Sequence, residues 1–326
     1  MKFLIGFLLY FLSFFIFAQE KTLTIYTTET FASQWGPGTK IKNIFEKKYK
    51  CKINYQIFPN SISIINRLKL EKSNTKANII LGIDQTLIHE AEQTNLFGKN
   101  KIKLSDLNLP VQWKDTYFIP YDYGYFAFIY NNKKLKNPPQ SLSQLINDKN
   151  ISVVYEDPRM DTAGTGFMLW MKAVYGKDAS KMWKKLSTHT LTVTNNWTQA
   201  FNLFRKGEAD MVLSYTTDPA YSLIEEQNNS FSAASFSEGH YMQIQVAGYI
   251  KENNSKLTQN FMSFILSKGF QNEMPTGSWM YPVIKTKLPK EFDSLIRPKK
   301  SLLFSPVEVF QNKEKWQSEW ENSVSN

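Results

Sequence analysis

The stretch "TYFIPYDYGYFAFIYN", residues 116–131, is a dense run of aromatic and β-forming residues near the middle of the chain. Pro120 and Gly124 interrupt it, and segments with alternating strand and helix patterns stand on both sides. We therefore interpret it as extended chain that passes from one α/β domain to a second. A second long β run, "HYMQIQVAGYI" at 240–250, could carry the chain back.

Strand and helix patterns alternate outward from this run in both directions. The expected strands are 23–29, 52–58, 77–83, 151–157, 191–195 and 211–217. The expected helices are 39–49, 63–72, 86–94, 141–148, 164–176, 198–208, 256–270 and 307–324. This order predicts mostly parallel sheets with helices on both faces, and the length of the chain favours two such domains.

The first residues have the pattern of a signal peptide. An uncharged apolar run from Phe3 to Phe17 follows Lys2, and Ala18 offers a small residue for cleavage. The run is shorter than the about 20 residues that a transmembrane helix needs. We expect residues 1–18 to be removed and the mature protein to be soluble in a bacterial periplasm.

Charge and cysteine content narrow the classes of function. The formal net charge is +10, but the lysines are spread along the chain and the sequence contains no arginine-rich block. This favours a solvated surface over a nucleic-acid partner. Cys51 is the single cysteine, so an intramolecular disulfide is impossible. We expect a monomer stabilised by ordinary cores.

Polar and aromatic residues gather just beyond the expected strands. They are Trp35, Asn60, Ser61, Asp84, the segment 157–166, Trp197, Tyr215 and Tyr221. In open α/β sheets, ligands bind outside the carboxyl ends of the strands. The pattern therefore predicts a two-lobed binding protein with a ligand cleft between the lobes.

Catalytic and metal-binding patterns are scarce. "HEAEQ" (89–93) lacks the second histidine of a zinc-protease helix, and His189 and His240 stand in no ligand spacing with His89. Glu156 and Asp157 form a possible carboxylate pair, although such acids more often cap a helix or close an ion pair. We expect no catalytic residue, no metal and no cofactor, and hence a protein that is not an enzyme.

Three tryptophans stand in loops or at a helix start and predict the ligand. Trp35 lies beside Gly-Pro-Gly, Trp197 begins a helix, and Trp279 lies in "PTGSWMYP". Each is either a core residue or a platform for a ligand. Trp and Tyr faces attract organic cations and stack on flat rings. The helical tryptophans are typical of core residues: Trp170, Trp183, Trp316 and Trp320.

At this point the chain resembles the periplasmic thiamine-binding proteins of bacterial thiamine importers. The resemblance covers essentially the whole mature chain. It is carried by "WGPG" (35–38), "NRLKLE" (66–71), "YDYGYFAF" (121–128), "KLKNPPQSL" (134–142), "DPR" (157–159), "VLSYTT" (212–217), "FSEGHY" (236–241) and "PTGSWMYPV" (275–283).

The resemblance implies a type II periplasmic binding fold with a strand hinge and a central ligand cleft. One lobe would hold residues 19–124 and about 240–280, and the other 125–239 and about 281–326. The ligand would be thiamine or a phosphate ester, delivered to the membrane permease of an ABC importer. The implied ligand contacts are Trp35, Trp197, Tyr215, Tyr221 and Trp279.

Two positions depart from the family pattern at the end of the cleft that would hold the hydroxyethyl or phosphate group. Asn60-Ser61 stands where relatives carry an acidic residue followed by glycine, and Asp161 replaces a serine. Asp161 either caps a helix or faces the ligand. A carboxylate there would repel phosphate, so we expect a preference for free thiamine over its phosphates.

Three other functions remain open. A ferric-ion binder would need paired tyrosines with a nearby histidine or acid, and Tyr215 and Tyr221 are well separated in sequence. A polyamine binder would need several carboxylates at the cleft, where the sequence shows few. An exported thiamine-degrading enzyme would need a nucleophile, and Cys51 begins a strand at its far end.

Overall fold

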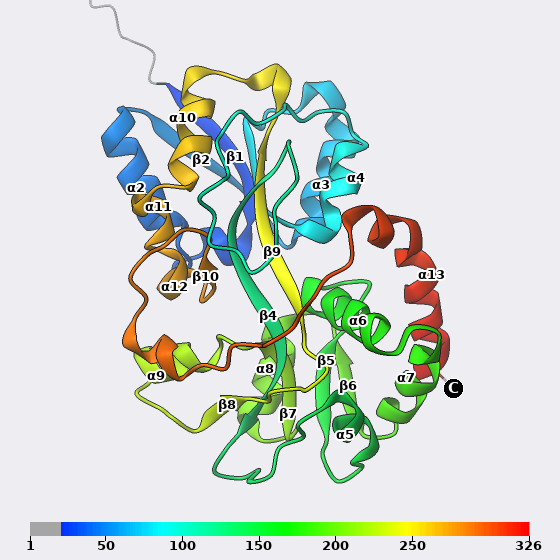
Figure 1. Cartoon of the computed structure of the whole chain (residues 1–326). Helices are drawn as coiled ribbons and strands as arrows, with labels where there is room; N and C mark the ends of the chain where they lie inside the picture. Colours follow the sequence, from blue (N-terminus) through cyan, green and yellow to red (C-terminus); the bar gives the residue numbers. More distant parts are fainter. Residues whose placement is uncertain (1–20, 326) are drawn as a thin grey trace, which may run out of the picture.

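The computed structural model describes residues 21–325, and Figure 1 shows two α/β lobes, one above the other. The predicted signal peptide lies outside the described residues. The strands are β1 (Thr22–Thr28), β2 (Lys52–Phe58), β3 (Ile79–Asp84), β4 (Ile119–Asn131), β5 (Val153–Glu156), β6 (Thr190–Thr194), β7 (Met211–Tyr215), β8 (Phe231–Ala233), β9 (His240–Tyr249), β10 (Tyr281–Pro282) and β11 (Ser301–Leu302).

Helices cover the strands of both lobes. They are α1 (Glu29–Ala32), α2 (Gly38–Tyr49), α3 (Ser61–Glu71), α4 (Ile88–Glu92), α5 (Leu142–Asn147), α6 (Thr162–Tyr175), α7 (Ala179–Ser187), α8 (Trp197–Lys206), α9 (Pro219–Glu225), α10 (Lys256–Ile265), α11 (Lys268–Gln271), α12 (Met274–Gly277) and α13 (Pro306–Val324). No helix within residues 21–325 is long and apolar enough to cross a membrane.

Hydrogen bonds join the main strands in the order β2-β1-β3-β9-β4-β7-β5-β6. We call the half with β1, β2 and β3 the first lobe and the half with β5, β6 and β7 the second lobe. Pairing within each of these groups is parallel, as the alternation predicted, whereas β9 and β4 pair antiparallel to their neighbours. The sequence suggested two separate sheets, but β4 and β9 connect them into one series.

Strand β4 belongs to both lobes. Its residues 119–125 pair with β9, and its residues 126–130 pair with β7 (Figure 1). Gly124 lies at the change of partner, where an added Cβ would stand 2.6 Å from Met280 Sδ and 3.5 Å from the Tyr215 ring. A side chain at this position would require the end of Met280 to shift. The middle run of the sequence is therefore the connection that it was predicted to be.

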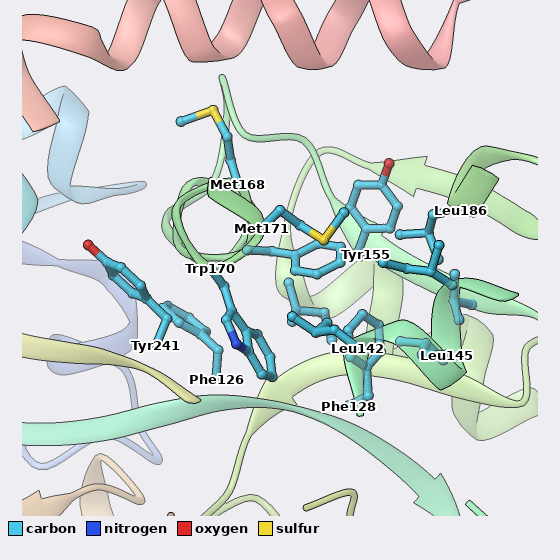
Figure 2. Packing of buried hydrophobic residues seen from close by; sticks show 14 of the residues in the cluster. Phe126, Phe128, Leu142, Leu145, Tyr155, Met168, Trp170, Met171, Leu186 and Tyr241 are labelled. Atoms are coloured by element: carbon cyan, nitrogen blue, oxygen red, sulfur yellow. The ribbon is translucent and has the colours of Figure 1, made fainter. Parts of the chain in front are cut away.

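Both faces of each half of the sheet are buried. In β1, Ile25 and Tyr26 enter different apolar clusters, and Tyr155 and Val154 do the same in β5. This is the expected result of alternating side-chain direction between two helix layers. Figure 2 shows the largest cluster of the second lobe, in which Trp170 of α6 packs above β4.

The C-terminal segment contacts both lobes. Val283 and Phe292 pack in a first-lobe cluster, whereas Trp316 and Trp320 of α13 pack in the second-lobe cluster. At the other end of α13, the Phe310 ring stands 4.8 Å from His89 of α4. The division of residues between two independently moving lobes stays a prediction.

Most predicted elements are present with small shifts at their ends. The helix expected at 256–270 is instead broken into α10 and α11. Ser267 leaves the helix with an extended backbone, and its hydroxyl donates to the Phe264 carbonyl at 2.7 Å. Such a bond from a serine side chain competes with helical hydrogen bonding.

Candidate functional site

The first lobe contributes the ends of β1 and β3 and the start of α3. Asn60 is the N-cap of α3 and accepts the Ser63 backbone N–H at 2.8 Å. The Ser61 hydroxyl donates to the Gly82 carbonyl at 2.7 Å. These two predicted ligand residues therefore order the helix start, which is the usual role of asparagine and serine there. Their contact with a ligand stays a prediction.

Two glycine loops of the first lobe bring Trp35 and Trp279 into neighbouring segments. A Cβ added to Gly277 would stand 2.7 Å from Pro37, so the "PTG" and "GPG" turns are in direct contact. Trp35 is 62% exposed. Trp279 has a φ of 56°, an uncommon backbone conformation for a bulky residue, which tends to persist at functional sites.

Trp279 also reaches the second lobe. Its ring stands edge-on to Tyr221 of α9, with 5.2 Å between ring centroids and 86° between planes. Next to it in the chain, Met280 Sδ lies 4.0 Å from the Thr217 hydroxyl. Two of the predicted aromatic contacts, one from each lobe, thus lie side by side.

In the second lobe, Asp161 and Trp197 are held together. Asp161 caps α6 by accepting the Ala163 backbone N–H at 2.7 Å. Burial raises the pKa of Asp161, and the nearby backbone N–H of Trp197 offsets part of that rise. The Trp197 indole donates from Nε1 to Ser214 Oγ at 2.6 Å. The capping alternative for Asp161 is confirmed. This does not exclude a ligand role, because the two lone-pair regions of a carboxylate accept several bonds.

Buried carboxyl groups form a feature that the sequence analysis largely missed. The charges of four acids raise the pKa of Tyr215 beyond the effect of burial, and they come from both lobes: Asp84, Glu156, Asp161 and Asp218. Asp122 of β4 adds a fifth carboxyl group. Asp84, Asp122 and Glu156 are buried, whereas Asp161 and Asp218 are half-buried. Within residues 21–325 none of the five forms an ion pair with lysine or arginine. The expectation of few carboxylates at the site is wrong.

Burial shifts the protonation of these groups. It raises the pKa of Asp122 and of Asp218 to about 7 each, and it raises that of Glu156 well above its usual range. The hydroxyl of the nearby Ser278, which donates to the Met274 carbonyl at 3.1 Å, offsets the effect of burial on Asp122 only in part. No described residue hydrogen-bonds the carboxyl oxygens of Asp122 or Glu156. An organic cation would stabilise their charged forms.

The sequence signal for these acids was ambiguous. Glu156 and Asp157 are adjacent, and only Asp157 behaves as the ion-pair alternative predicted, with Arg159 Nη2 at 2.7 Å. Glu156 points to the other side of the strand and has no such partner. Asp122 is a single acid inside an aromatic run, where no spacing rule marks it. Asp84 stood at a strand end, as expected for a site residue.

The histidines have structural roles. His240 is buried and accepts the Phe236 backbone N–H at Nε2, while its Nδ1 lies 2.7 Å from the Phe126 carbonyl. Burial lowers its pKa to about 4, so the ring is neutral. His189 Nδ1 lies 2.7 Å from the Ile151 carbonyl. Residues 21–325 contain no group of three acidic, histidine or cysteine side chains placed to hold a metal ion.

Two α/β lobes joined by crossing strands, with aromatic and acidic side chains at the facing strand ends, define a solute-binding protein of the type II periplasmic class. Residues 40–292 match the family model of bacterial extracellular solute-binding proteins. The thiamine-binding periplasmic protein of Escherichia coli (strain K12) is 46% identical over 312 residues, which cover 95% of each chain. The chain belongs to this family of solute-binding proteins, among its thiamine-binding periplasmic members.

Solved structures agree with this assignment. A periplasmic thiamin binding protein superposes with a TM-score of 0.89 at 46% identity, covering 95% of this chain and 98% of that one. Iron-bound HitA from Pseudomonas aeruginosa gives a TM-score of 0.75 at 18% identity, covering 93% of this chain and 99% of that one. The second likeness concerns the fold alone.

Proposed function

We propose that this protein binds thiamine between its lobes in the periplasm and delivers it to the membrane permease of an ABC importer. One observation carries the proposal: flat aromatic side chains stand beside buried carboxyl groups that have no cationic partner. Thiamine offers two flat rings and one positive charge. Aromatic faces attract such a cation by about 0.5–2 kcal/mol each. The relatives named for thiamine binding support the same ligand.

The proposed role is transport without chemistry, since the family is one of solute-binding proteins. Cys51 is buried in the first-lobe cluster beside α2 and β2, away from the strand ends that carry the site. It is thus poorly placed for a nucleophile, and we propose that the ligand leaves unchanged. We also propose that the protein acts as a monomer that meets its permease with ligand bound.

The other ligands are weaker candidates on chemical grounds. His240 is a poor candidate ligand for Fe³⁺, because both of its ring nitrogens already contact backbone groups of Phe236 and Phe126. The buried carboxyl groups suit a polyamine better than the sequence suggested, yet a flexible aliphatic chain would leave the aromatic faces without a stacking partner. Relatives at 36–46% identity are named for thiamine and favour neither alternative.

The acids also bear on phosphorylated ligands. Asp161 and Asp218 lie in the second-lobe part of the site, and a carboxylate repels a phosphate by about 1–4 kcal/mol at roughly 4 Å. We propose that free thiamine binds more tightly than thiamine monophosphate or diphosphate. The Asp161→Ser variant, which keeps a capping side chain at α6, separates the effect of charge from that of the helix cap.

Tryptophan fluorescence and calorimetry test the proposal. Thiamine should quench the fluorescence saturably and titrate as one site, and it should be recovered unchanged. Spermidine and ferric citrate, titrated in the same way, should give no comparable binding. A protein that binds iron or spermidine more tightly than thiamine would overturn the proposal.

We further propose that β4 and β9 form the hinge, with residues 19–124 and about 240–280 moving against 125–239 and about 281–326. The Trp279–Tyr221 contact joins residues from both sides, so a ligand beside it favours the closed form. Small-angle scattering should show a smaller radius of gyration with thiamine. An unchanged radius at proven saturation would mean that the free protein is already closed.

A further inference from the structure

A chain of hydrogen bonds leads from the Trp197 ring into the second lobe. Trp197 Nε1 donates to Ser214 Oγ at 2.6 Å, and Ser214 Oγ donates in turn to a carboxylate oxygen of Asp218. Ser214 is fully buried in β7, and Asp218 follows it by four residues at the start of α9. Three elements, α8, β7 and the turn before α9, thus meet at this indole.

Trp197 is half-buried, and one face of its ring is covered. Phe201, one helical turn later, stacks on the indole with 4.8 Å between centroids and 21° between planes. The backbone N–H of Trp197 lies near enough to Asp161 to offset part of the rise in pKa that burial causes in that carboxyl group. One ring face is therefore covered by a phenyl group, and the ring edge is fixed by the serine.

The direction of the two hydrogen bonds made by Ser214 determines how Asp218 acts on the indole. A serine hydroxyl has one proton to donate and lone pairs that accept. Because Asp218 in its ionised form accepts a hydrogen bond from the Ser214 hydroxyl, the serine oxygen is left to accept the indole N–H. Hydrogen bonds that end on an ionised group are stronger than neutral ones, and bonds in a chain polarise one another. Electron density on the indole ring increases as its N–H is drawn toward an acceptor.

We propose that Asp218 is a positioning residue that acts through Ser214: it fixes the plane of Trp197 and makes the open face of the indole a better platform for a cationic ring. The proposal rests on the proposed binding of thiamine. It assigns to Ser214 and Asp218 a contribution to selectivity for a charged ligand over an uncharged one of similar shape. Neither residue needs to touch the ligand for this effect.

The first test reads Trp197 without any ligand. Protein labelled with ¹⁵N-tryptophan contains eight indole N–H groups, and the Trp197→Phe variant identifies the Trp197 resonance. We expect this resonance to shift upfield in Ser214→Ala and to shift partway in Asp218→Asn, while the other indole signals stay in place. Ser230→Ala, which removes a buried serine hydroxyl elsewhere in the same lobe, should leave all of them unchanged.

The second test measures binding of thiamine and of thiochrome, its uncharged and flat oxidation product. We expect Ser214→Ala and Asp218→Asn to weaken thiamine binding about 5- to 30-fold, and to change thiochrome binding less than about twofold. Equal losses for both ligands would mean that the chain only supports the fold of the site. An unshifted Trp197 resonance in both variants would overturn the proposal outright.

The two tests separate this inference from the proposed function. If the wild-type protein bound no thiamine, the proposed function would fail, and the selectivity claim would fail with it. The resonance of Trp197 would still show whether Asp218 and Ser214 hold the indole. Thermal unfolding of each variant checks that it is folded. If Ser214→Ala unfolds, the test is made with Asp218→Asn, which preserves the shape of the side chain.

Discussion

Trp197 and Trp35 were predicted as the same kind of ligand platform, yet the protein holds them very differently. Trp197 is fixed by Ser214 and Phe201. Trp35 is 62% exposed and makes no hydrogen bond or ring contact with another residue of the described chain. Immobilising a large side chain on binding costs about 0.5–1.5 kcal/mol. We therefore propose that Trp197, as a ligand platform, is already ordered, whereas Trp35 would be ordered by the ligand.

The largest effect should come from removing the platform that is already ordered. We expect Trp197→Ala to weaken thiamine binding by about 2–3 kcal/mol, because stacking and cation–π attraction are lost. The Trp197 side chain is already ordered in the free protein, so its removal saves no entropy cost of ordering it on binding. Calorimetric titration measures the change. Leu191→Ala, an exposed apolar residue of β6 in the same lobe, is the control and should bind as the wild type does. A loss below about 0.5 kcal/mol would show that Trp197 is not a platform.

A second effect concerns the buried acids. The pKa of Asp122 is raised from 3.8 to about 7 by burial, so the folded protein binds this proton more tightly than the unfolded chain does. The free energy of unfolding should therefore fall as pH rises, by about 1–3 kcal/mol between roughly pH 5 and pH 7.5. Denaturant unfolding at several pH values, without ligand, measures this slope.

Asp122→Asn should flatten that slope and stabilise the protein at the upper end of the range, because a neutral amide avoids the cost of a buried charge. Asp218, with a similarly raised pKa, supplies the slope that remains. Asp106→Asn changes an exposed acid and should keep the wild-type slope. Stability that rises with pH in the wild type would contradict this assignment of charge.

The smallest effect should come from Trp35. We expect Trp35→Ala to weaken thiamine binding by only about 0.5–1 kcal/mol and to leave the free energy of unfolding unchanged, since the side chain is mostly exposed. Titration and denaturant unfolding of the same sample check both values. A loss as large as that of Trp197→Ala would remove the distinction between the two platforms.

Local patterns were sufficient to predict the fold. Alternating apolar residues marked β2, short β-forming runs marked β1 and β5, and the aromatic run at 116–131 correctly indicated a strand shared by two lobes. The short strands β10 and β11 were missed, because a strand of two residues is too short to show an alternating pattern of apolar and polar residues. The contacts of α13 with both lobes could not be predicted either, since an amphipathic helix does not specify which surface covers it.

Only some residues of the candidate site could be picked out from the sequence. Tryptophans next to glycine and proline are unusual enough to be noticed, so Trp35 and Trp279 stood out. Buried acids depend on three-dimensional surroundings: Glu156 and Asp157 are neighbours in sequence, but only Asp157 meets an arginine. Ser214 is an ordinary strand residue until Trp197 and Asp218 are placed on either side of it. Such hydrogen-bond networks join residues from separate segments, and no regular spacing in the sequence shows that these residues meet.

The most direct test of the account is native mass spectrometry of the protein purified from the periplasm without added ligand. The account predicts that the folded protein carries one molecule with the mass of unmodified thiamine, and that Trp197→Ala carries much less of it. Recovery of the wild-type protein with iron, with a polyamine or with a chemically altered thiamine would contradict it.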